Sequence, residues 1–148
     1  MNYETVMREL FERIPQSQET WNTRFDYMGD EKSIQYVVFG SVLIPALEEA
    51  LSAGNLGVIL PVCAFLEDVA VTAKNDSYLE SLLRVEVGEW LGGVANESLL
   101  APWLGTETKR ICRYVPGLAT QRIALREERK RRSLLNRLST FLKNLRKK

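Results

Sequence analysis

The most informative absence in this sequence is histidine, because none of its 148 residues is a histidine. Without an imidazole the chain lacks the general base of Ser–His–Asp and Cys–His sites and the nitrogen ligand of most zinc centres. The carboxylate-bridged di-iron bundle is excluded as well, because it needs a Glu-x-x-His motif. These catalytic and metal-binding classes are therefore not available to the protein.

Cysteine is scarce too. Cys63 and Cys112 are far apart in the sequence and form no Cys-x-x-Cys motif, so a zinc site made of thiolates is excluded. Cys63 lies in an apolar run, where a thiol behaves as a small hydrophobic group. Cys112 lies between Arg110 and Arg113, which would favour the thiolate of an exposed cysteine, but we expect an inert thiol. This cysteine usage suits a reducing compartment, and we predict a cytoplasmic protein.

Phosphate-binding glycine motifs and long hydrophobic runs are also missing. Neither G-x-x-x-x-G-K-[ST] nor G-x-G-x-x-G occurs. The longest apolar run, residues 56–66, reaches across about half of a bilayer and contains Pro61, so we do not expect it to cross a membrane. The first ten residues carry charges where a signal peptide needs an apolar core, and they show no export signal. From these absences we predict that the protein is not an enzyme and uses no cofactor or metal ion.

The pattern that is present throughout the chain is the helical one. Tyr3, Val6 and Leu10 illustrate the spacing of three and four residues, and Pro15 ends that first helix. Pro45 is expected to kink a later one. No segment shows sustained alternation of apolar and polar residues. We therefore predict an all-α single domain, a bundle of about seven helices in antiparallel pairs stacked like a short solenoid, with a long basic C-terminal helix.

Several helix ends can be assigned from the residues themselves. Gly54 has the position of a C-cap glycine at the end of a helix that begins near residue 34, and Ser33 is expected to be the N-cap of that same helix. Ser77 and Glu80 have the spacing of a capping box, and Thr106 is expected to be the N-cap of a short helix after residue 105. Gly92–Gly93 and Pro116–Gly117 are expected to end helices.

Charge is distributed very unevenly along the chain. Residues 1–105 carry six Lys/Arg and sixteen Asp/Glu, a net charge of −10, whereas residues 106–148 carry fourteen Lys/Arg and three Asp/Glu, a net charge of +11. Such asymmetry often marks an interaction surface or a charged tail. We divide the chain into an acidic helical body, residues 1–117, and a basic amphipathic helix, residues 118–148, which we expect to pack on the same domain.

The C-terminal helix combines a basic patch with a regular apolar stripe. Four interpretations are compatible with this pattern: a final helix packed on the body, a nucleic-acid binder, a helix lying on an anionic membrane, and a helix docked in a partner's groove. Interleaved aromatic residues are lacking and the apolar face is narrow, which makes nucleic acid and membrane unlikely partners in our interpretation. The patch consists of Arg126, Arg129, Lys130, Arg131 and Arg132, and the stripe of Leu134, Leu135, Leu138, Phe141, Leu142 and Leu145.

Carboxylates are the only plausible catalytic groups that remain. Glu48–Glu49 and Glu67–Asp68 are pairs of neighbours in sequence, so on a helix their side chains diverge, as on a solvated face. Glu86 differs, because at 100° per residue it falls in the apolar sector of its helix. A glutamate in that position has to find a hydrogen-bond partner or remain protonated, and we expect a structural role.

Three phrases carry a family resemblance: "VVFGSVLIPALEEAL" (37–51), "FLEDVAVTAKNDSYLESLLRVEVGEWLGG" (65–93) and "WLGTETKR" (103–110). Residues from about 15 to 110 resemble a family of small all-α bacterial proteins that look like immunity proteins of polymorphic toxin systems, including contact-dependent growth inhibition. The resemblance implies stoichiometric binding of a cognate toxin domain, with no turnover. Six residues are then our candidates for the interface: Glu48, Glu49, Glu67 and Asp68, with Trp21 and Trp103 as aromatic anchors. The oligomeric state stays open.

Overall fold

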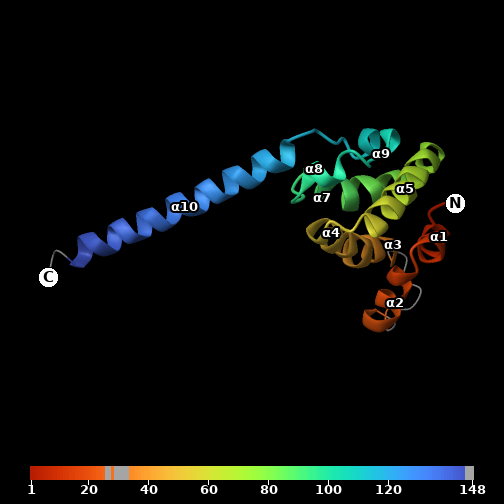
Figure 1. Ribbon diagram of the computed structural model, residues 1–148, viewed down its shortest axis with the longest axis horizontal. Coiled ribbons are helices and arrows are strands. Elements are labelled where there is room, and N and C mark those ends of the chain that lie inside the picture. Colours follow the sequence, from red (N-terminus) through yellow and green to blue (C-terminus); the bar gives the residue numbers. More distant parts are fainter. Residues whose placement is uncertain (26–27, 29–33, 146–148) are drawn as a thin grey trace.

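The computed structural model describes residues 1–25, 28 and 34–145, with side chains as far as residue 138 (Figure 1). The described residues are all-α and contain no strand, and they form eight continuous helical segments rather than about seven. Three segments contain more than one element, because π- or 3-10-helical turns join α-helices without a break. In chain order the elements are α1 (Val6–Arg13), α2 (Pro15–Arg24), α3 (Ile34–Val38), η2 (Phe39–Leu43), α4 (Ile44–Ala53), α5 (Leu56–Thr72), η3 (Ala73–Asn75), α6 (Ser77–Leu82), η4 (Leu83–Gly88), α7 (Glu89–Leu91), α8 (Glu97–Leu100), α9 (Thr106–Ile111) and α10 (Leu118–Leu145).

A helical hairpin, residues 34–75, runs through the middle of the body. Its two halves pack together and are joined at Gly54 and Asn55. Gly54 has a φ of 64° and donates its N–H to Leu51 O, as predicted for a C-cap glycine. The Asn55 side chain accepts a hydrogen bond from Gly57 N at 3.0 Å and so caps α5. The predicted cap at Ser33 lies outside the described residues.

The expected break at Pro45 takes the form of a wide turn rather than an end. Proline cannot donate to the carbonyl one turn earlier, and its ring crowds that turn. The five residues immediately before α4, Phe39–Leu43, accordingly form the π-helical segment η2, and the helix continues through it. A second π-helical segment, η4, packs against η2. Wide turns of this kind often occur where a fold builds a function.

Two predicted helix caps are wrong, and both are replaced by carboxylates. Asp76, not Ser77, is the N-cap of α6, and its Oδ1 accepts hydrogen bonds from Tyr78 N at 3.0 Å and Leu79 N at 3.2 Å. Thr106 is the first residue of α9 rather than its cap, and Gly105 precedes it. The free N–H groups of α9 are instead satisfied by a side chain from another helix, described below.

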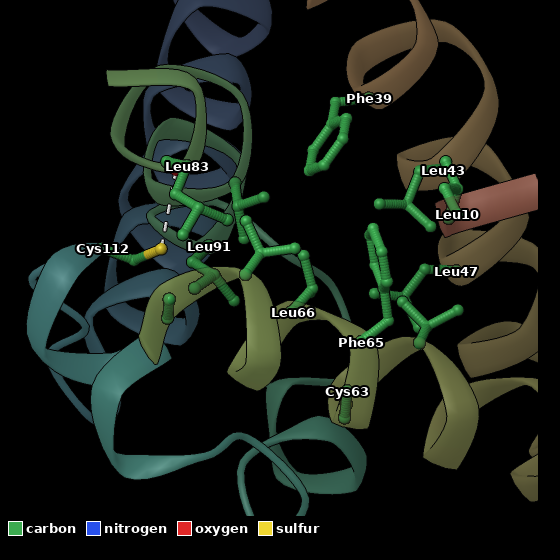
Figure 2. Close-up of a cluster of buried hydrophobic side chains, with 14 of the residues drawn as sticks. Leu10, Phe39, Leu43, Leu47, Cys63, Phe65, Leu66, Leu83, Leu91 and Cys112 are labelled. Atoms are coloured by element: carbon green, nitrogen blue, oxygen red, sulfur yellow. Dashed lines mark hydrogen bonds between the residues drawn. The ribbon is translucent and has the colours of Figure 1, made fainter. Parts of the chain in front are cut away.

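The core lies between the hairpin, α1 and the helices that follow (Figure 2). Phe39 and Phe65 face each other from the two halves of the hairpin, with ring centroids 6.1 Å apart. Cys63 and Cys112 are both buried. Burial raises the pKa of Cys63 to about 11 and that of Cys112 to about 12. The Cys112 thiol donates to Leu83 O at 3.6 Å, so both cysteines are inert thiols as expected.

The C-terminal helix packs on the body only at its start, where Ala119 is buried in the core. Figure 1 shows α10 leaving the body beside α7 and α8 and extending away as a single straight rod. The stripe leucines with described side chains, Leu134, Leu135 and Leu138, are 60%, 55% and 57% exposed. The expectation that this helix packs on the same domain is therefore correct for its first turns, around Ala119, and wrong for the three stripe leucines. We call residues 118–145 the arm and the rest of the described chain the body.

The two halves of the hairpin are long and apolar enough to cross a membrane by length and composition. Ile34–Ala53 has a mean hydropathy of 1.4 and Leu56–Asn75 one of 1.9 over their most apolar windows, and 44% of each window is buried inside the body. Central helices of a folded body also pass this test. The second helix is longer than the apolar run visible in the sequence, because it continues past residue 66.

Candidate functional site

A hydrogen bond between side chains joins α4 to α7 at the surface of the body. Trp90 Nε1 donates to Glu48 Oε1 at 2.9 Å, although the two residues are 42 positions apart. Trp90 is half-buried and packs on the core, while Glu48 is exposed. The indole therefore holds the Glu48 carboxylate in place and leaves its other oxygen free for a partner.

Glu86 lies at the same junction, on η4. Its carboxylate occupies the space where a side chain on Gly40 would begin, so a larger residue at that position of η2 would have to displace the Glu86 side chain. Glu86 is half-buried and makes no hydrogen bond or ion pair among the described residues. Burial, and then the nearby negative charge of Glu89, raise the pKa of this carboxyl. The partner expected for Glu86 is thus not found.

Glu48, Glu86, Glu89 and Trp90 form what we call the acidic face. None of its three carboxylates takes part in an ion pair of the described residues. Arg122 and Arg126 of the arm line a pocket of about 100 Å³ together with Glu89. The acidic face therefore presents negative charge that the rest of the body leaves uncompensated.

The groups on this face suit the binding of cationic groups. The described residues hold no cluster of three or more His, Cys, Asp or Glu side chains suited to a metal ion. Carboxylates next to a half-buried indole do match the guanidinium and ammonium groups of a protein partner. Fixed acids also direct the encounter with a basic surface.

Glu67, a predicted interface residue, has a structural role instead. Its carboxylate caps α9 by accepting hydrogen bonds from Glu107 N at 3.0 Å, Thr108 N at 2.9 Å and Thr108 Oγ1 at 2.8 Å. Burial opposes ionisation of Glu67, but these hydrogen bonds outweigh it and lower its pKa. Both carboxylate oxygens of Glu67 accept hydrogen bonds from α9, so Glu67 is not an acid available to a partner. This contact could not be predicted from the sequence, because its donors and acceptor are 40 and 41 residues apart.

Glu97 fixes the place where the arm begins. It is buried, at 7% exposure, and accepts hydrogen bonds from Tyr114 Oη at 2.6 Å, Gly117 N at 2.7 Å and Thr120 Oγ1 at 3.4 Å. Burial by itself would raise the pKa of Glu97, yet the hydrogen bonds dominate and lower it. Burial and the bond to Glu97 raise the pKa of Tyr114 to about 12. We call this group the Glu97 latch. None of its residues is among the site residues predicted from the sequence.

The basic patch on the arm is exposed, as expected for a charged cluster. Part of it is neutralised locally, since Lys130 pairs with Glu127 at 3.3 Å and Arg132 pairs with Glu128. At 100° per residue its five members point to all sides of α10. The patch therefore surrounds the helix and does not form a single binding face. All five side chains, Arg126, Arg129, Lys130, Arg131 and Arg132, are exposed.

The structure separates the remaining predicted interface residues. Asp68 is paired with Arg13, and Trp21 is only 8% exposed and stacked on Phe25, so a buried Trp21 cannot act as a surface anchor. Glu49 stays exposed beside Glu48, and Trp103 is 44% exposed on another part of the body. No family model, curated protein or solved structure matches the chain at a significant level.

Proposed function

We propose that this is an immunity-type protein, which binds a cognate bacterial toxin domain through the acidic face and neutralises it without turnover. The observation that carries the proposal is the uncompensated charge of Glu48, Glu86 and Glu89 beside the half-buried Trp90. Asp68 and Glu107, in contrast, are paired with cations from the body. The resemblance seen in residues 37–51 and 65–93 agrees with this function, and both stretches contribute to the acidic face.

The mechanism follows from electrostatic complementarity. Toxin domains that act on nucleic acid need a cation-lined active site, because their substrate is a polyanion. Residues 1–105 carry a net charge of −10, which attracts such a surface and speeds the encounter. Once bound, the carboxylates occupy the place of the substrate phosphates. The inhibition is stoichiometric, and it needs no chemistry from the immunity protein.

The test is co-expression with the C-terminal domain encoded by the reading frame directly upstream. The wild-type protein is expected to restore growth of cells that express this domain. The double variant Glu48→Gln/Glu89→Gln is expected to bind the domain about a hundredfold more weakly and to fail in protection, since paired interfacial charges each contribute several-fold to affinity. Binding is measured by calorimetry on the purified pair.

Glu19→Gln is the matched control, because Glu19 is an exposed acid on α2, away from the acidic face. It is expected to protect like the wild type. Full protection by the double variant would show that the acidic face is not the inhibitory surface. Absence of any protection by the wild-type protein would remove the immunity function for that toxin.

A second candidate function is favoured by the exposure of α10. An exposed basic helix could bind nucleic acid or an anionic membrane. Under this alternative the protein is retained on DNA or on anionic vesicles, retention falls as salt is raised, and removal of residues after 132 abolishes it. The acidic face argues for the toxin-binding proposal, because the net charge of −8 on residues 1–117 repels both of these anionic partners.

A further inference from the structure

The arm carries an apolar stripe that nothing in the described chain covers. Leu134 and Leu138 lie one helical turn apart, and both are more than half exposed. Leu125 is also exposed, at 55%, but it precedes Leu134 by nine residues and so lies on the opposite side of the helix. The stripe is thus a defined face rather than a general property of the arm. In the sequence its spacing continues with Phe141, Leu142 and Leu145.

The stripe cannot fold back onto its own body. The Glu97 latch holds Tyr114, Gly117 and Thr120, which fixes both the start and the direction of α10. From Leu118 the helix is continuous, with a rise of about 1.5 Å per residue, which places Leu134 about 24 Å from the start of the arm. An uninterrupted helix does not bend back over that distance. Cover for the stripe therefore has to come from another molecule.

The body offers a matching surface on the hairpin. Leu56 and Leu60 lie one turn apart at the start of α5, and they are 45% and 39% exposed. Residues 33–73 contain no Lys or Arg. Of their four acids, Glu67 caps α9 and Asp68 pairs with Arg13, which leaves Glu48 and Glu49 exposed and without an ion pair among the described residues. A surface of exposed leucines with these two free acids complements an arm that is apolar and basic.

From these two faces we propose that the occupant of the stripe is a second copy of this chain. The arm of one copy lies with Leu134 and Leu138 on the Leu56–Leu60 row of the other, and its basic side chains approach the acids of that hairpin. The exchange is reciprocal, so one two-fold axis closes the dimer and leaves no arm free for further growth. The proposal does not depend on toxin binding.

Charge argues against the two other ways of covering the stripe. Two arms pairing with each other would bring together residues 118–148, which carry eleven Lys/Arg and two Asp/Glu, a net charge of +9 each. On an anionic membrane the arm would be attracted but the acidic body repelled, and Glu127 lies on the same side of α10 as the stripe, where it would face lipid. Against the hairpin of a second copy, the basic arm meets acids rather than another basic arm, and Glu127 is not placed in lipid.

The first test is the mass of the full chain in solution, measured by sedimentation equilibrium over a wide concentration range. The wild type is expected to be a dimer. Leu134→Ser/Leu138→Ser is expected to weaken the dimer at least about a hundredfold, because leucines are lost from both interfaces at once. Leu125→Ser is the matched control on the opposite side of α10, and it is expected to stay dimeric. Circular dichroism and the thermal midpoint check that each variant is folded.

The second test distinguishes arm-to-hairpin exchange from arm-to-arm pairing. Leu60→Ser leaves the arm unchanged and is expected to be monomeric. A mixture of Leu60→Ser with Leu134→Ser/Leu138→Ser is expected to form a heterodimer, since the intact arm of the first variant meets the intact hairpin of the second.

Three results would overturn the proposal. One is a monomeric wild type at every concentration. Another is a Leu60→Ser variant that remains a dimer while the arm variant does not, which would mean that the arms pair with each other. The third is a monomer that binds vesicles of anionic phospholipid through the stripe, with binding lost in Leu134→Ser/Leu138→Ser, which would assign the stripe to the membrane.

Discussion

The first helix and the last helix carry the same pattern and have opposite fates. In α1, Val6 and Leu10 are spaced one turn apart and are fully buried. In α10, Leu134 and Leu138 have the same spacing and are 60% and 57% exposed. The comparison teaches that apolar periodicity predicts a helix and the face it offers. It does not predict whether the cover for that face lies in the same chain.

The difference between body and arm has a physical cause at their junction. α1 is followed at once by α2 and lies against the hairpin, so its stripe meets apolar groups of the same domain. The arm is held by the Glu97 latch with its stripe about sixteen residues further along a straight rod. The four predictions below test this comparison, from the largest expected effect to the smallest.

Replacing one buried and one exposed side chain gives the largest contrast. Phe65→Ala removes a fully buried ring that packs on Phe39, and it is expected to lower the free energy of unfolding by about 3–5 kcal/mol. Leu138→Ala is expected to change it by less than about 0.5 kcal/mol in dilute protein. Both values come from urea denaturation followed by circular dichroism. Equal losses would mean that the arm packs on its own body.

Breaking the latch should loosen the arm. Glu97→Ala leaves the Tyr114 hydroxyl and the Gly117 N–H without their acceptor, and it is expected to cost about 2 kcal/mol of stability. Amide exchange in the first turns of α10 is expected to become faster. Glu127→Ala, which removes only an exposed ion pair, is the control and is expected to cost less than about 0.5 kcal/mol. Unchanged exchange in Glu97→Ala would show that the latch does not fix the arm.

The two capping carboxylates should make the body sensitive to acid. The pKa values of Glu67 and Glu97 are lower in the folded state than in the unfolded one. Their contribution to stability is therefore present above the unfolded pKa, and it is lost as pH falls through the folded pKa. Urea denaturation at a series of pH values is expected to show that the free energy of unfolding falls less steeply with decreasing pH in Glu67→Gln than in the wild type. Identical pH dependence would contradict the role assigned to Glu67.

Glu86 should behave in the opposite way, with a smaller effect. Burial and Glu89 raise the pKa of this carboxyl in the folded state, so its ionised form opposes folding and stability rises as pH falls through the folded pKa. Glu86→Gln is expected to raise the free energy of unfolding at neutral pH by about 0.5–1 kcal/mol, which is measured as a higher thermal midpoint. A lower midpoint would mean that the carboxylate has a stabilising partner.

Much of the fold follows from residues that are close together in sequence. Pro15, Gly54 and the Pro116–Gly117 pair mark helix boundaries as predicted, since a proline or a glycine acts on its own turn. The caps at Asp76 and Glu67 were missed for different reasons. Asp76 competes with the neighbouring Ser77 for the same position, and Glu67 reaches α9 from another helix.

The candidate site was predicted only in part. Glu48 and Glu49 are exposed as expected, but the acidic face also needs Glu86, Glu89 and Trp90, which were considered for other roles or not at all. Trp21 was lost from the surface because it stacks on Phe25 and packs against the core. Helical phase places a side chain on a face, and only the neighbouring elements decide whether that face is open.

The sequence by itself determined an all-α chain, its main boundaries and the division into an acidic body and a basic arm. These depend on helix period, turn residues and charge counts, which are local or additive properties. The tertiary structure decided which acids are held in hydrogen bonds within the body and which are free. It also left the apolar stripe of the arm uncovered. The reason is that the partners of Glu67, Glu48 and Glu97 come from 17 to 42 residues away, at contacts that exist only once the helices have packed.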